Sequence, residues 1–274
     1  MHQNFYQFDF ELPNQEETDK LIALLSDQGF DGFVEEADSL TAFIPELKFN
    51  QETFEKVLEK FSILLYTKSD IENINWNKKW ESEFEPVLVD NFVAIRAHFH
   101  QPIPTVQHEI IITPKMSFGT GHHATTHLVI QQMQLLNFTN KTVFDFGTGT
   151  GVLAILAEKL GATSVFAIDN DEWSITNTKE NIDQNNCKHI SVKQMETIPT
   201  GKQYDIILAN INLNVITASL TSLAAIAHAG TDIVFSGFLK ADEATMKKAI
   251  NKAGFQYLST TKKGEWIVVA AKKL

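Results

Sequence analysis

The stretch Thr142-Val-Phe-Asp-Phe-Gly-Thr-Gly-Thr-Gly151 decides the fold of this chain. Residues 142 to 146 are mostly β-branched or aromatic, and residues 152 to 160 carry apolar side chains at helical spacing, so the segment predicts a strand, a tight loop and a helix. The loop contains three glycines, Gly147, Gly149 and Gly151. Glycine permits positive φ angles and a close backbone approach, so free N–H groups at the start of the helix can face a polar or anionic ligand. The pattern is typical of a nucleotide-binding turn.

Two acids flank this turn and narrow the choice of ligand. The dinucleotide fingerprint G-x-G-x-x-G requires its third glycine at position 152, where the chain has Val152, so NAD is disfavoured. Asp145 precedes the first glycine by two residues, and Asp169 ends a second apolar strand over residues 164 to 168. A carboxylate at that strand end is the usual acceptor for a ribose diol. The pattern D-x-G-x-G-x-G followed by this acid resembles motif I of the class I methyltransferases that use S-adenosylmethionine (SAM), and it implies a SAM site.

The net charge of −11 is unevenly distributed over the 274 residues. Residues 1 to 100 hold 20 acidic and 8 basic side chains, whereas residues 101 to 274 hold 14 and 15. An acidic N-terminal surface either serves solubility or attracts a basic partner, and it repels a nucleic-acid backbone. We therefore expect no direct binding to nucleic acid, and we leave the two explanations of the acidic surface open.

Cysteine content and hydropathy indicate the compartment. The single cysteine, Cys187, excludes an intramolecular disulfide framework and a cysteine-based zinc cluster. The sequence shows no N-terminal apolar signal segment and no apolar run of 18 residues. We expect a cytoplasmic protein without a membrane segment, and a monomer.

Residues 1–70 predict a small α+β domain that precedes the glycine-rich part of the chain. The hydrophobic periodicity predicts the element order β-α-β-β-α-β, with strands over residues 6–12, 30–36, 40–45 and 63–66 and helices over 15–28 and 50–61. This order is that of a ferredoxin-like domain. Residues 71–100 then predict a connector, in which Trp76 and Trp80 lie on one helical face and serve packing. We expect residues 87–97 and 108–113 to form a hairpin that bridges the two halves.

A second glycine loop, Phe118-Gly-Thr-Gly-His-His-Ala-Thr-Thr126, leads into a helix expected from Ala124 to Leu136. Threonines in the first turn of a helix often only cap backbone donors, which accounts for one threonine but not for the whole loop. His122 and His123 are adjacent, have no histidine partner at i+4 and have no cysteine nearby, so we expect no metal site.

Strands alternate with helices through residues 101–274 until two adjacent strands end the chain. This pattern predicts an α/β fold, a doubly wound seven-stranded sheet with a terminal antiparallel hairpin. Ligands of such sheets bind at the carboxyl ends of the strands, where Gly147, Asp169 and Asn210 are expected. Amine methyltransferases with an Asn-Pro-Pro-Tyr signature hold the acceptor nitrogen at the position of Asn210, but this chain continues with Ile211-Asn212.

The whole chain resembles the ribosomal protein L11 methyltransferase family. The resemblance rests on the segment from Trp76 to Pro86, the Phe118–Thr126 string, the Asp145–Gly151 turn, Asp169 and the Asn210 loop. It implies that SAM is contacted by Thr126, Gly147, Asp169 and Asn210, and that Phe118, Gly119, Thr120, Gly149 and Gly151 shape the pocket. It also implies that Asn210 is catalytic, that the first domain recognises the substrate, and that the acceptors are lysine ε-amines and the N-terminal α-amine of L11.

Two other functions stay open from the sequence. One is a methyltransferase that acts on another basic protein or on a small amine, although a small acceptor needs no separate docking domain. The other is a SAM-binding ribosome-assembly factor with little turnover, which the polar Asn210 loop weakly disfavours.

Overall fold

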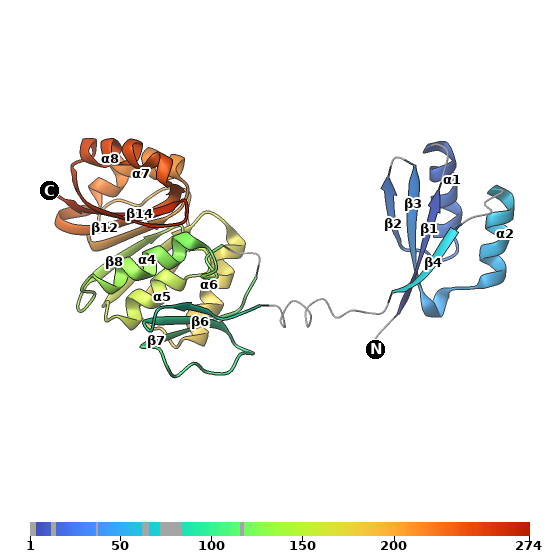
Figure 1. Ribbon diagram of the computed structural model, residues 1–274, viewed down its shortest axis with the longest axis horizontal. Helices are drawn as coiled ribbons and strands as arrows, with labels where there is room; N and C mark the ends of the chain where they lie inside the picture. Colours follow the sequence, from blue (N-terminus) through green and yellow to red (C-terminus); the bar gives the residue numbers. More distant parts are fainter. Residues whose placement is uncertain (1–3, 12–14, 37, 62–65, 72–83, 116–117) are drawn as a thin grey trace. The chain divides into compact units, whose positions relative to one another are not determined.

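The computed structural model of the 274-residue chain describes residues 4–11, 15–36, 38–61, 66–71, 84–115 and 118–274. The chain divides into two compact units, residues 1–83 and residues 84–274 (Figure 1). Trp76 and Trp80, to which the sequence assigned a packing role, lie outside the described residues. In the part of the chain that the structure describes, every helix is too short or too polar to cross a membrane.

The first unit is an antiparallel sheet with two helices. Its elements are β1 (Phe5–Glu11), α1 (Gln15–Ser26), β2 (Gly32–Glu36), β3 (Ser39–Pro45), α2 (Gln51–Phe61) and β4 (Tyr66–Ile71). The strand order is β2-β3-β1-β4. Both helices pack on the same face of the sheet, because the buried side chains of β1 and β3 share one core with Leu21 of α1 and Phe54 of α2. The rings of Phe8 and Phe54 lie 4.5 Å apart at the centre of this core. The ferredoxin-like element order is confirmed, although the last strand covers residues 66–71, and residues 63–65 of its expected range lie outside the described residues.

The second unit begins with a small sheet of β5 (Val87–Val89), β6 (Val93–Ala97) and β7 (His108–Ile112). The strands β5 and β6 form an antiparallel hairpin, whereas β7 runs parallel to β6. The expected hairpin between residues 87–97 and 108–113 is therefore wrong. A parallel partner needs a crossover, which residues 98–107 supply. The buried Arg96 holds this crossover because its guanidinium donates to the carbonyl of His100 and pairs with Glu109.

The main sheet has seven strands in the order β10-β9-β8-β11-β12-β14-β13. The strands are β8 (Thr142–Phe146), β9 (Ser164–Asp169), β10 (Ile190–Gln194), β11 (Tyr204–Asn210), β12 (Ala227–Leu239), β13 (Phe255–Lys263) and β14 (Trp266–Lys273). The strands from β8 to β12 pair in parallel, and β14 pairs antiparallel with both β12 and β13. The predicted doubly wound sheet and its terminal hairpin are confirmed.

Helices cover both faces of this sheet (Figure 1). One core receives α4 (Ala124–Gln134), α5 (Val152–Lys159) and α6 (Glu172–Gln184), and the other receives α7 (Leu213–Ala225) and α8 (Glu243–Lys252). The chain winds from β8 toward β9 and β10 on one side and continues through β11 and β12 on the other. The strand order therefore switches between β8 and β11, which is where such sheets bind their ligands.

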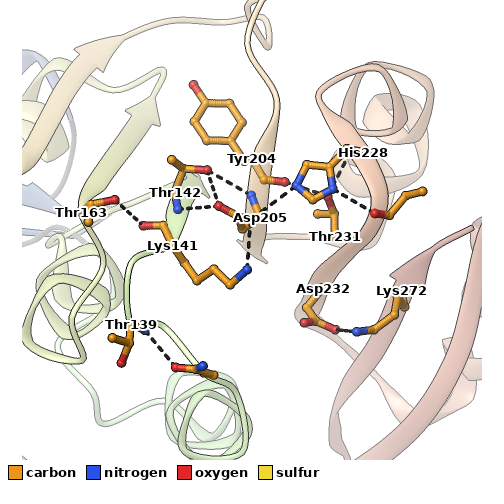
Figure 2. Close-up of polar contacts among 12 residues, drawn as sticks. Thr139, Lys141, Thr142, Thr163, Tyr204, Asp205, His228, Thr231, Asp232 and Lys272 are labelled. Carbon is orange, nitrogen blue, oxygen red and sulfur yellow. Dashed lines mark hydrogen bonds and ion pairs between the residues drawn. The ribbon is translucent and has the colours of Figure 1, made fainter.

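The amino ends of β8 and β11 are joined by the carboxylate of Asp205 (Figure 2). Its Oδ2 accepts hydrogen bonds of 2.8 Å from both the backbone N–H and the hydroxyl of Thr142. Its Oδ1 pairs with Lys141 at 3.2 Å and with His228, at the start of β12, at 3.5 Å. Partial burial raises the pKa of Asp205, but the hydrogen bonds from Thr142 and Lys141 outweigh it and lower the pKa to about 2. The charged form of Asp205 thus stabilises the fold.

We predict that Asp205→Asn destabilises the second unit by about 1 kcal/mol at pH 7, because the amide loses the ion pair and one strong acceptor. The contribution is fully present above the unfolded pKa near 4 and is lost as the pH falls toward the folded pKa of about 2. Urea titrations of both proteins at pH 7 and pH 3 measure the difference. As the control, Asp232→Asn removes only the ion pair with Lys272, and it should cost less than about 0.5 kcal/mol. An equal loss in both variants would contradict the role given to Asp205.

Candidate active site

A cavity of about 470 Å³ opens at the carboxyl ends of β8, β9 and β11. Its size falls in the range of small-ligand sites. Five of the predicted site residues line it, namely Phe118, Gly147, Gly149, Asp169 and Asn210. A narrower space behind the glycine loop is lined by Gly119 and Thr126 together with Phe118, Gly147 and Asn210.

Two predicted residues lie outside both spaces. Thr120 places its hydroxyl 3.1 Å from Nδ1 of His122, at the surface. Gly151 caps α5 with φ of 82° and packs against Thr178 of α6. Both positions therefore support the loops from behind and do not face the cavity.

The glycine loop, residues 147–151, touches two other loops at positions where a side chain cannot fit. A Cβ on Gly149 would lie 2.2 Å from the carbonyl oxygen of Phe118, and a Cβ on Gly147 would lie 2.1 Å from Cγ2 of Ile211. The φ angles of these glycines are 57° and 77°. Both glycines are required by close contact as well as by backbone conformation.

Asp145 occupies the amino end of α5, where the sequence led us to expect free N–H groups. Its carboxylate accepts a hydrogen bond of 2.7 Å from the Thr148 hydroxyl, and the nearby backbone N–H of Ala154 in α5 favours its charged form. Its Oδ1 is buried and finds no hydrogen-bond partner among the residues that the structure describes. Burial, reinforced by the nearby charge of Asp169, raises the pKa of Asp145 to about 7. A second anion is unfavourable beside this acid, so the amino end of α5 does not suit a phosphate.

Asp169 ends β9 and faces the cavity. Its Oδ2 accepts a hydrogen bond of 2.9 Å from the N–H of Gly149, and its Oδ1 accepts one of 3.1 Å from the N–H of Asp171. These two bonds fix the carboxylate, and each oxygen keeps a second lone pair for an incoming hydroxyl. The geometry fits a ribose diol.

Asn210 ends β11 and is 6% exposed. Its Nδ2 donates to the hydroxyl of Thr126 at 3.4 Å, while its Oδ1 has no hydrogen-bond partner in the described part of the chain. The next residue, Ile211, packs tightly between two glycines. A Cβ on Gly147 would lie 2.1 Å from its Cγ2, and a Cβ on Gly237 of β12 would lie 2.2 Å from its carbonyl oxygen. The side chain of Asn210 is therefore a fixed, uncharged acceptor at the cavity wall.

His123 and Trp266 also line the cavity, and the sequence did not indicate either role. The rings of His123 and Trp266 meet edge to face at 4.5 Å, and Phe118 lies 5.2 Å from His123. The Nδ1 of His123 accepts a hydrogen bond of 3.3 Å from the N–H of Thr125, which leaves Nε2 as the ring nitrogen that can donate. His123 therefore contributes shape and a donor to the site. The string F-G-T-G-x-H, on which the family resemblance rests, includes His123, whereas no local sequence pattern points to Trp266.

The described residues contain no group of three side chains that could hold a metal ion. They do fit SAM, because Asp169 faces the cavity as a hydroxyl acceptor and the glycine loop forms a cradle that a Cβ would fill. A doubly wound seven-stranded sheet with this site defines a class I, SAM-dependent methyltransferase.

Comparison with known proteins specifies the family. The family model for Ribosomal protein L11 methyltransferase (PrmA) matches residues 10–274. The ribosomal protein L11 methyltransferase of Bacteroides fragilis is 35% identical over 274 residues, covering 97% of this chain and 98% of the relative. That of Chlorobaculum parvum is 38% identical over 259 residues, covering 90% and 89%. The chain belongs to the ribosomal protein L11 methyltransferase family.

Solved structures agree with this membership. A crystal structure of ribosomal protein L11 methylase from Lactobacillus delbrueckii subsp. bulgaricus is 28% identical, has a TM-score of 0.64, and covers 70% of this chain and 100% of its own. A methyltransferase from Pyrococcus furiosus, at 16% identity and a TM-score of 0.51, covers 60% of this chain and 88% of its own, and it shares the fold.

We predict that affinity for S-adenosylhomocysteine, the demethylated form of SAM, weakens as the pH falls from 7.5 to 5.5. A ligand ammonium favours the ionised form of Asp145, whose pKa is about 7 without ligand, so binding releases a proton. The dissociation constant should rise by up to about tenfold per pH unit below 7. Titration calorimetry in two buffers of different ionisation enthalpy measures both affinity and proton release. Asp145→Asn should remove the release, and an unchanged release in that variant would assign it to another group.

Proposed function

We propose that this protein transfers methyl groups from SAM to lysine ε-amines and to the N-terminal α-amine of ribosomal protein L11. The observation that carries the proposal is the match to the L11 methyltransferase family across both units, residues 10–274. The uncharged acceptor Asn210 at the cavity wall supports an amine as the methyl acceptor.

When it is bound, SAM supplies a methyl group on a sulfonium, and the group that leaves is the neutral thioether of S-adenosylhomocysteine. The protein has to present a neutral amine in line with the bond that breaks, and positioning carries most of this work. A lysine with a pKa near 10.4 is neutral in roughly one molecule in 10³ near pH 7.4, whereas an α-amine near 7.7 is roughly one third neutral. Asn210 accepts a hydrogen bond from the amine without a charge that would favour the ammonium form.

We assign different roles to the two parts of the chain on the basis of their charges. We assign substrate recognition to residues 1–70, a connector to residues 71–100 and methyl transfer to residues 101–274, although residues 84–100 of that connector range belong to the second compact unit. The excess of 20 acidic over 8 basic side chains in residues 1–100 attracts a basic ribosomal protein. These acids dock the substrate at a distance from the reacting nitrogen, since a carboxylate beside the amine slows the reaction. We further assign a monomer in the cytoplasm that makes no direct contact with nucleic acid.

A methyltransferase for another basic protein or a small amine is the second candidate, since the same site would serve it. A SAM-binding assembly factor with little turnover is the third. The experiments below separate all three.

We predict that purified L11 incubated with this protein and SAM gains mass in steps of about 14 Da, the mass of each added methylene. Asp169→Ala should abolish the gain, because the ribose loses its acceptor and SAM binding weakens. Intact-mass and peptide mass spectrometry locate the modified amines. Normal S-adenosylhomocysteine binding without any mass gain on L11 would keep the cofactor and replace the substrate, and a panel of small amines then tests the second candidate.

We predict that Asn210→Ala lowers kcat by roughly 10²-fold, a typical loss for one polar contact in an active site. The matched control is Asn212→Ala, which lies in the same loop, lines the same cavity and caps α7 through Val215. The control should lower the melting temperature, because a cap contributes about 1 kcal/mol, but keep kcat within a few fold.

Asn210→Asp distinguishes the role of charge from the role of shape. The new carboxylate favours the ammonium, so the pH at which the rate rises should move upward. An unchanged kcat in Asn210→Ala would remove Asn210 from the acceptor site and favour the assembly factor if wild-type turnover is also low.

A further inference from the structure

The buried face of α6 is polar at the centre. Thr178 and Asn181 are both fully buried. The hydroxyl of Thr178 donates to the carbonyl of Gly149 at 2.7 Å, and Nδ2 of Asn181 donates to the carbonyl of Thr150 at 2.8 Å. Gly149 and Thr150 are central residues of the glycine loop. Helix α6 therefore holds the glycine loop through hydrogen bonds to the carbonyl groups of the loop.

Asn181 also reaches in the opposite direction. Its Oδ1 accepts a hydrogen bond of 2.8 Å from the N–H of Thr113, the residue that directly follows β7. Thr150 in turn binds the other glycine loop, since its N–H donates to the carbonyl of Phe118 at 2.9 Å and its hydroxyl donates to that of Gly119 at 2.7 Å. One amide side chain thus joins the glycine loop to the chain on the approach to Phe118.

The glycine loop needs such partners because it is poorly restrained by its own sequence. Its three glycines have φ angles of 77°, 57° and 82°. Glycine loses more conformational freedom on folding than any other residue, so an unsupported loop samples other peptide orientations. Rotation of the Gly149–Thr150 peptide would also turn the N–H of Thr150 away from the Phe118 carbonyl, to which it donates.

We propose that Asn181 and Thr178 are positioning residues of the cofactor site, which hold the glycine loop and the adjoining Phe118–Gly119 segment in the conformation that binds SAM. Neither side chain lines the cavity; each acts through the backbone of the loop. The proposal depends on the SAM site and not on the identity of the methyl acceptor.

The test uses two matched variants on one helix. Asn181→Asp keeps the acceptor for Thr113 but turns a carboxylate oxygen toward the carbonyl of Thr150. Asn185→Asp makes the same chemical change one turn later, where the amide bonds, among the described residues, only to the N–H and carbonyl of Ile111 and to the carbonyl of Asn181. Both should lower the melting temperature. Only Asn181→Asp should weaken S-adenosylhomocysteine binding, by about tenfold or more in titration calorimetry well below both melting temperatures.

Thr178→Val provides a second variant that keeps the shape of the side chain and removes the donor to Gly149. It should weaken binding of S-adenosylhomocysteine by about threefold to tenfold. In steady-state assays both loop variants should raise the KM for SAM and leave the KM for the methyl acceptor unchanged. Wild-type affinity in the two variants, or an equal loss in Asn185→Asp, would overturn the proposal. Should Asn181→Asp fail to fold, Thr178→Val decides alone.

Discussion

The close approach of the Gly149 backbone to the carbonyl of Phe118 is the contact on which the site depends. No Cβ fits at Gly149, and the next residue, Thr150, fixes the same carbonyl by a hydrogen bond of 2.9 Å. Ile211 makes the equivalent contacts with Gly147 and Gly237 on the other side of the site. Three loops from distant parts of the sequence therefore meet at glycines. These glycines allow the loops to pack closely against one another, and the cavity lies between the packed loops.

Charge decides which ligand this geometry accepts. In dinucleotide-binding folds the amino end of the first helix carries a phosphate, whereas here the carboxylate of Asp145 already occupies that end. An acid in this position turns an anion site into a site for cations. Asn210, which faces the same cavity, is neutral, and a neutral acceptor suits an amine that must lose its proton. The buried acid at the end of α5 thus disfavours an anion there, and Asn210 avoids stabilising a positive charge on the acceptor.

The sequence was sufficient for the order of elements and for the residues on the strand ends, because hydrophobic periodicity and glycine spacing are local signals. It placed Gly147, Asp169 and Asn210 at one edge correctly. It failed for β7, because a strand of this length pairs equally well in either direction until the crossover of residues 98–107 and the Arg96–Glu109 pair are known. Trp266 reaches the cavity only through the pairing of β14 with β12. That pairing joins segments about thirty residues apart, and no local pattern records it.

Helix α6 shows why a buried helix face need not be apolar. The rule that buried faces are hydrophobic holds where a helix covers side chains, as at Ile182 of α6, but α6 also covers backbone. On one side lie the carbonyls of the glycine loop, and on the other lie the free edge of β7 and the residue after it, where Ile111 bonds to the amide of Asn185 and Thr113 bonds to that of Asn181. Buried peptide groups require partners, and an apolar face would leave them unsatisfied at a cost of about 1–3 kcal/mol each. A row of asparagines at helical spacing substitutes for a missing strand. Asn181 in this row also holds the glycine loop of the cofactor site, so the same side chain bonds to the chain beside the sheet edge and to the loop.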